Sequence, residues 1–266
     1  MISDCYKYLI SPKSNKKLIK GEDIFFTKDK TEKYGIINNI PILLPQSKIN
    51  DYMKNTYKAD FVYFKKTDCA FIKNLVLKLK LAKGSFILDL GAGEGVYSSF
   101  FYNMGMNVVA LDFSKYMLEK GQKNNSFVDF IAGDAHSIPF ANNSFDVIFC
   151  SGLSLFNTEH VKNETKLVHH IISKLRKKGY LIFIASTNLS GKMRNSWYPV
   201  TFQDLDGLFS SYNIKYKWFI PRLIIPLVLK QHAFSNRSSI FFSIIVKFFS
   251  FIHRKIRGRI IYVIEK

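Results

Sequence analysis

The sequence of 266 residues contains only three cysteines, Cys5, Cys69 and Cys150, and they lie far apart. No two of them form a Cys-x-x-Cys pair, so their spacing matches neither a zinc motif nor a redox motif. An odd, sparse set of cysteines is typical of reduced thiols inside a cell. We therefore expect a protein without a metal ion.

Long apolar runs are also missing. No run reaches the ~18 residues that a membrane-spanning helix requires. The first residues, Met1 to Leu9, lack the apolar core of a secretory signal peptide. Both absences favour a cytoplasmic protein.

Negative charge is scarce, because 20 Asp and Glu face 39 Lys and Arg, which gives a formal net charge of +19. Such an excess attracts nucleic acid, anionic membrane or acidic substrates. Arginine, whose planar guanidinium suits phosphate, accounts for only seven of these basic residues. We interpret much of the excess as solvated lysine surface without a specific partner.

The most informative segment that is present runs from Phe86 to Gly95 and reads Phe-Ile-Leu-Asp-Leu-Gly-Ala-Gly-Glu-Gly. An apolar run of strand length ends in three closely spaced glycines, and residues suited to a helix follow up to Met104. This is the strand–turn–helix unit that binds nucleotides. Dinucleotide enzymes place glycines at the first, third and sixth positions, but here the sixth position is Val96.

The glycine spacing resembles motif I of the class I S-adenosylmethionine (SAM) dependent methyltransferases. Four further segments follow in that family's order, and the resemblance covers residues 50–190. They are Val108–Asp112 as a second strand ending in an acid, Phe127–Ala135 as a third strand and loop, Phe145–Cys150 as a fourth strand, and Leu175–Ile184 as the turn into the fifth.

The resemblance implies SAM as the cofactor. It implies that Asp112 accepts hydrogen bonds from the ribose hydroxyls, that Asp134 receives the adenine amino group, and that the Ala135 amide meets the adenine ring. Asp89 either lies near the methionine end of the cofactor or caps the glycine turn. The other implied cofactor positions are Gly91, Ala92, Gly93, Gly95, Phe113 and Cys150, and Cys150 also suits a small buried apolar residue.

The expected fold is α/β: a seven-stranded, mostly parallel Rossmann-like methyltransferase sheet in the order 3-2-1-4-5-7-6, with helices on both faces. A small β-rich head at residues 1–47 precedes the methyltransferase domain at residues 48–266. The head resembles the zinc-ribbon-like head of some bacterial methyltransferases. Its four ligand positions hold residues that bind zinc poorly, namely Ser11, Ser14, Thr27 and Lys30. We expect a metal-free head held together by its apolar residues, which are Leu9, Leu18, Ile24, Phe25, Ile36, Ile40, Ile42, Leu43 and Leu44.

An apolar insert at about 221–257 separates the last two expected strands and ends in a basic cluster from His253 to Arg259. An apolar helix followed by cations fits a peripheral contact with an anionic membrane. The same residues also fit a helix buried between the sheet and its cap.

The end of the fourth strand, Cys150 to Phe156, lacks the Asn/Asp-Pro-Pro-Tyr signature that the family uses for base amino groups. The favoured function is therefore methyl transfer from SAM to a small-molecule, glycan or lipid-linked acceptor, most readily at oxygen. His160 is the candidate base, because an imidazole titrates near working pH. The head and the charge of +19 keep a ribosomal or transfer RNA methyltransferase open, and a SAM-binding scaffold without turnover is the third alternative.

Overall fold

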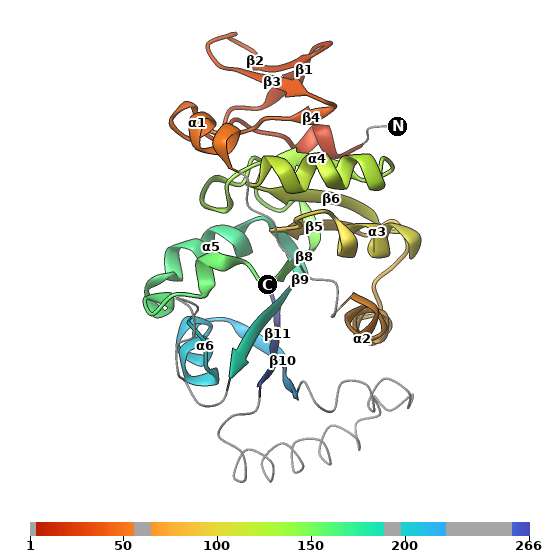
Figure 1. The fold of residues 1–266 in the computed structure, drawn as a ribbon, viewed down its shortest axis with the longest axis vertical. Coiled ribbons are helices and arrows are strands. Elements are labelled where there is room, and N and C mark those ends of the chain that lie inside the picture. Colours follow the sequence, from red (N-terminus) through yellow and green to blue (C-terminus); the bar gives the residue numbers. More distant parts are fainter. Residues whose placement is uncertain (1–3, 56–64, 189–197, 222–256) are drawn as a thin grey trace.

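The computed structural model describes residues 4–55, 65–188, 198–221 and 257–266, and it contains two connected sheets (Figure 1). The head is a four-stranded antiparallel sheet, β1-β2-β3-β4, preceded by the short helix η1. Its elements are η1 (Asp4–Tyr8), β1 (Leu18–Lys20), β2 (Ile24–Thr27), β3 (Lys33–Ile37) and β4 (Ile40–Pro41).

The larger sheet has seven strands in the order β10-β11-β9-β8-β5-β6-β7. The expected strand order is thereby confirmed. The strands β5 to β9 pair in parallel, and β10 and β11 add an antiparallel hairpin at one edge. The strands are β5 (Phe86–Leu90), β6 (Asn107–Asp112), β7 (Asp129–Ala132), β8 (Phe145–Ser151), β9 (Leu175–Asn188), β10 (Asn213–Pro221) and β11 (Arg257–Glu265).

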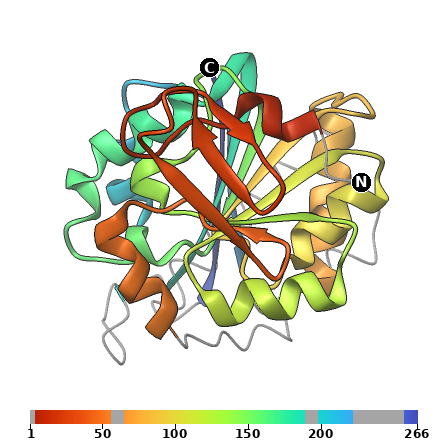
Figure 2. The same ribbon diagram turned by 90° about the horizontal axis from the view of Figure 1, so that it is seen from above.

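Helices cover both faces of the seven-stranded sheet (Figures 1 and 2). Helices α2, α3 and α4 pack on one face, and α5 and α6 pack on the other. Helix α1 connects the head to the rest of the chain. The helices are α1 (Gln46–Lys54), α2 (Lys65–Lys78), α3 (Val96–Asn103), α4 (Lys115–Asn124), α5 (Thr165–Ser173) and α6 (Phe202–Leu208), with short 3-10 turns η2 (Ala135–Ser137), η3 (Ser154–Phe156) and η4 (Val161–Asn163).

The strands of the parallel sheet are apolar on both sides, because helices bury both faces. All five residues of β5 are buried, including Asp89. Continuous apolar runs of this kind are typical of parallel strands. The sequence-based strands therefore agree with β5, β6 and β8 to within one residue at each end.

The head is joined to the outer edge of the large sheet. Ile42 forms a parallel bridge with Ala132 of β7, and the Leu43 amide donates to the Ala132 carbonyl at 2.9 Å. Near the N-terminus Leu9 forms an antiparallel bridge with Phe140. Seven of the nine expected head-core residues are buried, while Ile24 and Ile36 are only partly covered. The head thus shares its core with the main domain, since so small a sheet buries little apolar area alone.

The expected apolar insert falls almost wholly on residues 222–256, which lie outside the described residues. Its two attachment points are described, since Pro221 at the end of β10 pairs with Gly258 in β11. On its other edge β11 pairs with β9, and there Arg257 pairs with Asn188, the last residue of β9. Because β9 runs parallel to β8, the insert is attached at the carboxyl edge of the parallel strands.

Helix α4 and β7 pack so closely at Gly121 that a methyl group would not fit. A Cβ on this buried glycine would lie 2.5 Å from Cε1 of Phe130. We predict that Gly121→Ala lowers the free energy of unfolding by about 1–3 kcal/mol, because overpacking forces the ring to move. Phe130→Leu should recover part of this loss, as measured by denaturant unfolding.

Gly207 in α6 provides the matched control, because no atom lies within 4 Å of a Cβ placed there. Gly207→Ala should leave stability unchanged or raise it by about 0.5–1 kcal/mol, the usual difference in helix propensity. Equal losses for both alanine variants would contradict the packing explanation.

Candidate functional site

The turn after β5 depends on three glycines with left-handed backbone conformations. Gly91, Gly93 and Gly95 have φ values of 76°, 57° and 72°. Such angles disfavour any residue with a Cβ. Space is limiting as well, since a Cβ on Gly91 would lie 2.9 Å from Leu153 and one on Gly95 would lie 2.6 Å from Phe130. The turn therefore brings its backbone close to any ligand at the carboxyl edge.

Asp112 lies beside this turn because β6 pairs in parallel with β5. Its Oδ2 accepts the Gly93 amide at 2.7 Å, and its Oδ1 accepts the Ser114 amide at 2.7 Å. Burial raises the pKa of this carboxyl, and the amides of Ser114 and Gly93 oppose that rise. Each oxygen of a carboxylate can accept more than one hydrogen bond, so both remain available to a second donor such as a hydroxyl.

Asp89 is buried within β5, where Ser98 of α3 donates its hydroxyl proton to Oδ2 at 2.6 Å. Burial, supported by the nearby charge of Asp112, raises the pKa of Asp89 to about 7, although the Ser98 hydrogen bonds oppose it. Both roles expected from the sequence stay predictions. The hydrogen bond to Ser98 shows that Asp89 ties β5 to the helix behind the glycine turn.

Asp134 follows β7 and begins the short helix η2. Its Oδ1 accepts the His136 amide at 2.9 Å and lies 3.2 Å from the His136 ring. These contacts orient the carboxylate and use one oxygen, which leaves Oδ2 for another donor. Ala135 is buried next to it.

Cys150 and His160 lie in very different surroundings. Cys150 is fully buried in β8 between β5 and β9, and burial raises the pKa of its thiol. The His160 side chain is 72% exposed and its ring lies 3.5 Å from the Glu159 carboxylate. The structure thus groups the glycine turn, Asp89 and Asp112 at one edge and leaves His160 on the surface.

Helix α1 packs against residues of the candidate site, a contact that the sequence motifs alone do not indicate. Tyr52 is buried, and its ring lies 6.3 Å from that of Phe113, centroid to centroid. Ala92 and Phe113 pack against the same apolar cluster as Tyr52. Leu153 crowds Gly91, in keeping with the expectation from the sequence that the segment from Ser151 to His160 borders the site.

A second unexpected contact fixes the loop after Asp134. The ring Nε2 of His170, in α5, accepts the Ile138 amide at 3.1 Å. Burial lowers the pKa of His170 to about 4, and the cations Lys174 and His136 contribute in the same direction while Asp134 opposes them. Only the neutral ring can accept this hydrogen bond.

Comparison with known proteins agrees with this geometry. The profile of a methyltransferase domain family matches residues 88–183. The demethylmenaquinone methyltransferase of Renibacterium salmoninarum is 38% identical over 99 residues, which are 37% of this chain and 40% of that protein. The enzyme of the same name from Thermobifida fusca is 31% identical over 111 residues, 40% of this chain and 45% of its own. The chain thus spans less than half the length of these curated relatives.

Two solved structures extend the likeness over most of the chain. A protein of Pyrococcus horikoshii superposes with a TM-score of 0.55 at 15% identity, covering 81% of this chain and 98% of its own. Phosphoethanolamine N-methyltransferase 2 of Haemonchus contortus, solved with SAM, gives 0.53 at 17% identity and covers 81% of this chain and 59% of its own. This chain has the class I methyltransferase fold. Within that fold, residues 88–183 match the profile of a methyltransferase domain.

The His170 contact generates a pH prediction for this methyltransferase fold. The ordinary pKa of 6.5 applies in the unfolded chain, and the folded value is about 4. The unfolded chain therefore binds more protons between these values, so stability should fall as pH decreases from 6.5 to 4. The free energy of unfolding, measured across this range, should fall less in His170→Gln, because an amide oxygen accepts the Ile138 proton without titrating.

His160→Gln serves as the control, because the His160 side chain is 72% exposed and does not contribute to the pKa shift of His170. That variant should reproduce the wild-type pH profile. An unchanged profile in His170→Gln would remove His170 as the cause of the acid sensitivity.

Proposed function

We propose that the protein transfers the methyl group of SAM to an apolar small-molecule acceptor of the quinone type or to a lipid-linked acceptor. One structural observation carries the choice of acceptor. The apolar insert is attached where β9, β10 and β11 meet the carboxyl edge, and this is the edge that holds the glycine turn and Asp112. Ligands of open α/β sheets bind at that edge.

The residues present suit the cofactor. The turn adopts left-handed angles that glycine tolerates, and Asp112 presents two acceptor oxygens beside it. We assign Asp112 to the ribose hydroxyls, Asp134 and Ala135 to adenine, and the turn from Gly91 to Gly95 to the remainder of the cofactor. Phe113, held by Tyr52, forms the wall next to the ribose.

SAM would supply an already activated sulfonium, so that the acceptor forms a bond to the methyl carbon while the carbon–sulfur bond breaks and sulfur retains the electron pair. The protein's contribution is mainly alignment of the two reactants. A phenol or quinol must also lose its proton to a base or to water. We assign no role to His160 in that step, because its ring is exposed.

The relatives support the same class of acceptor. Several are named demethylmenaquinone methyltransferases. Transfer of that substrate to this chain is part of the proposal, and oxygen as the accepting atom stays a prediction from the sequence.

A contact with anionic membrane would suit such an acceptor. Tyr216 and Trp218 of β10 do not supply that contact, because both rings are partly buried against the apolar cluster beneath α2. Among the described residues no helix is long and apolar enough to cross a membrane. Cosedimentation with phosphatidylglycerol vesicles, but not with neutral vesicles, would test the contact.

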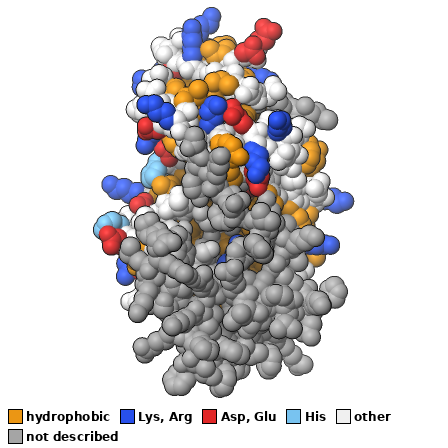
Figure 3. Space-filling model, viewed as in Figure 1, with side chains coloured by type: hydrophobic (Ala, Val, Ile, Leu, Met, Phe, Trp, Pro, Cys, Tyr) orange, Lys and Arg blue, Asp and Glu red, His pale blue; other side chains and the backbone are white. Residues whose placement is uncertain are grey.

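RNA is the less favoured acceptor. Basic and acidic side chains alternate over the described part of the face in Figure 3 instead of forming one basic surface. A continuous basic footprint is the usual feature of nucleic-acid binding.

The assignment of Asp112 predicts a loss of cofactor affinity. Asp112→Ala removes two charge-assisted hydrogen bonds and should weaken SAM binding by about 1–3 kcal/mol, measured by calorimetry. Asp51→Ala, on the exposed side of α1, is the control and should bind SAM normally. Unchanged affinity in folded Asp112→Ala would exclude the ribose assignment.

The acceptor class is tested by transfer of radiolabelled methyl from SAM into an extract of the source organism. We expect label in the lipid-soluble fraction, from which the product can be identified. Label in RNA would replace the proposal by an RNA methyltransferase. No label in any fraction, although calorimetry shows SAM binding, would indicate a SAM-binding scaffold.

A further inference from the structure

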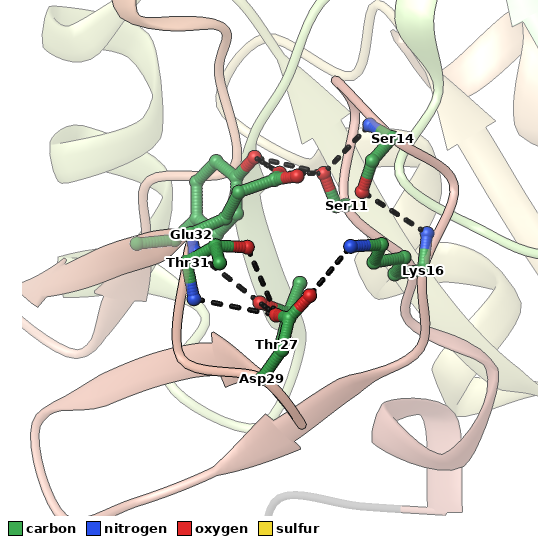
Figure 4. A network of polar contacts seen from close by, with 8 residues as sticks. Ser11, Ser14, Lys16, Thr27, Asp29, Thr31 and Glu32 are labelled. Atoms are coloured by element: carbon green, nitrogen blue, oxygen red, sulfur yellow. Dashed lines mark hydrogen bonds and ion pairs between the residues drawn. The ribbon is translucent and has the colours of Figure 1, made fainter.

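A network of side-chain hydrogen bonds occupies the part of the head where the resemblance places zinc ligands (Figure 4). The four positions are Ser11, Ser14, Thr27 and Lys30. Neutral hydroxyls and an ammonium are poor zinc ligands. No group of three or more His, Cys, Asp or Glu in the described part of the chain could hold a metal ion. The residues therefore do not fit the metal that the resemblance implies.

The first turn is organised around the buried hydroxyl of Ser11. The amides of Lys13 and Ser14 both donate to Ser11 Oγ at 3.0 Å. The chain then passes through Asn15 with a left-handed φ of 59°, and the Asn15 amide donates to the Ser11 carbonyl at 3.0 Å. Two amides that converge on one side-chain atom stabilise an electron-rich atom at that position.

The second turn is organised in the same way around Thr27, which is also buried. The Lys30 amide donates to the Thr27 carbonyl at 2.7 Å, and Lys30 has a left-handed φ of 58°. The Thr27 hydroxyl accepts the Glu32 amide at 3.2 Å and donates to Asp29 Oδ1 at 2.6 Å. Each turn therefore holds the hydroxyl oxygen of a buried residue, Ser11 or Thr27, by hydrogen bonds from backbone amides.

Two carboxylates connect the turns. Ser11 donates its hydroxyl proton to Glu32 Oε2, and the Tyr34 hydroxyl donates to the same oxygen at 2.8 Å. On the other side, the Lys16 ammonium lies 2.5 Å from Asp29 Oδ2. This ion pair lies at the surface of the head, because the Lys16 and Asp29 side chains are 54% and 42% exposed, and it links the first turn to the second.

We propose that this network replaces the metal ion: the Lys16–Asp29 pair and the Ser11–Glu32–Tyr34 hydrogen bonds join the two turns that zinc joins in the heads this one resembles. The inference does not depend on the proposed methyl transfer. It goes beyond the absence of ligands, because it names the groups that hold the turns together.

The ionisation of the network supports this interpretation. The hydrogen bond from Lys16 lowers the pKa of Asp29, with further contributions from Thr27 and Thr31. Burial opposes the charge of Glu32, but hydrogen bonds from Ser11, Ser14 and Tyr34 outweigh it and lower the pKa. Burial raises the pKa of Tyr34 to about 12, so its hydroxyl stays protonated as a donor. Both carboxylates are therefore charged at neutral pH.

The first experiment is a double-mutant cycle with Lys16→Met and Asp29→Asn in the full chain. The readout is hydrogen-exchange protection of the Ser14 and Glu32 amides, which donate to the Ser11 and Thr27 hydroxyls. Each single variant should lose protection several-fold, and the double variant should lose little more than either, because both remove the same pair. Additive losses, or protection unchanged from the wild type, would overturn the role of this pair.

Lys28→Met is the matched control, since Lys28 is an exposed lysine in the same turn. It should leave both amides protected. If Lys28→Met lost as much hydrogen-exchange protection as Lys16→Met, the turn would depend on the net positive charge of the head and not on the Lys16–Asp29 ion pair.

The second experiment restores thiolates with Ser11→Cys, Ser14→Cys, Thr27→Cys and Lys30→Cys together. If the two turns keep the ligand geometry, this variant should take up one zinc ion per chain, and chelator should lower its melting temperature. The wild type should hold no zinc and ignore chelator. Stoichiometric zinc in the wild type, or no zinc uptake by the folded four-cysteine variant, would overturn the proposal. The double-mutant cycle decides if that variant does not fold.

Discussion

The register of the parallel pair β5–β6 is the constraint on which the candidate site depends. Leu90 pairs with Leu111, so the glycine turn begins beside the residue that precedes Asp112. The Leu111 carbonyl accepts the amides of both Gly91 and Ala92, at 2.8 and 3.1 Å. The next amide, that of Gly93, then reaches the Asp112 carboxylate. A shift of one residue would separate the acid from the turn and move every side chain of β6 to the opposite face of the sheet.

The head is tied to this site through backbone and packing. Ile42 and Leu43 extend the pairing of β7, and α1 follows directly, so that Tyr52 packs against Phe113 next to Asp112. Burial and the charges of Glu119 and Asp112 raise the pKa of Tyr52, which keeps its hydroxyl neutral.

Sequence reasoning succeeds where one local pattern determines the structure. The apolar run before Gly91 and the acid at the end of β6 could each be predicted from adjacent residues. It fails where partners are distant in sequence, because the hydrogen bond between the Ile138 amide and His170 depends on tertiary packing. The role of His160 as a base stays a prediction from its residue type, and the fold adds that its side chain is exposed. The loss of the zinc ligands in the head could be predicted from the sequence, whereas the ion pair between Lys16 and Asp29 could not.

The charge state of Asp89 suggests how the site would distinguish a cationic ligand. A carboxyl with a pKa of about 7 is only partly ionised at neutral pH, because burial penalises its charge. A cation bound nearby would favour the carboxylate and release a proton. The buried hydrogen bond from Ser98 also ties this carboxyl to helix α3, so that the charge of Asp89 and the packing of α3 on β5 depend on each other.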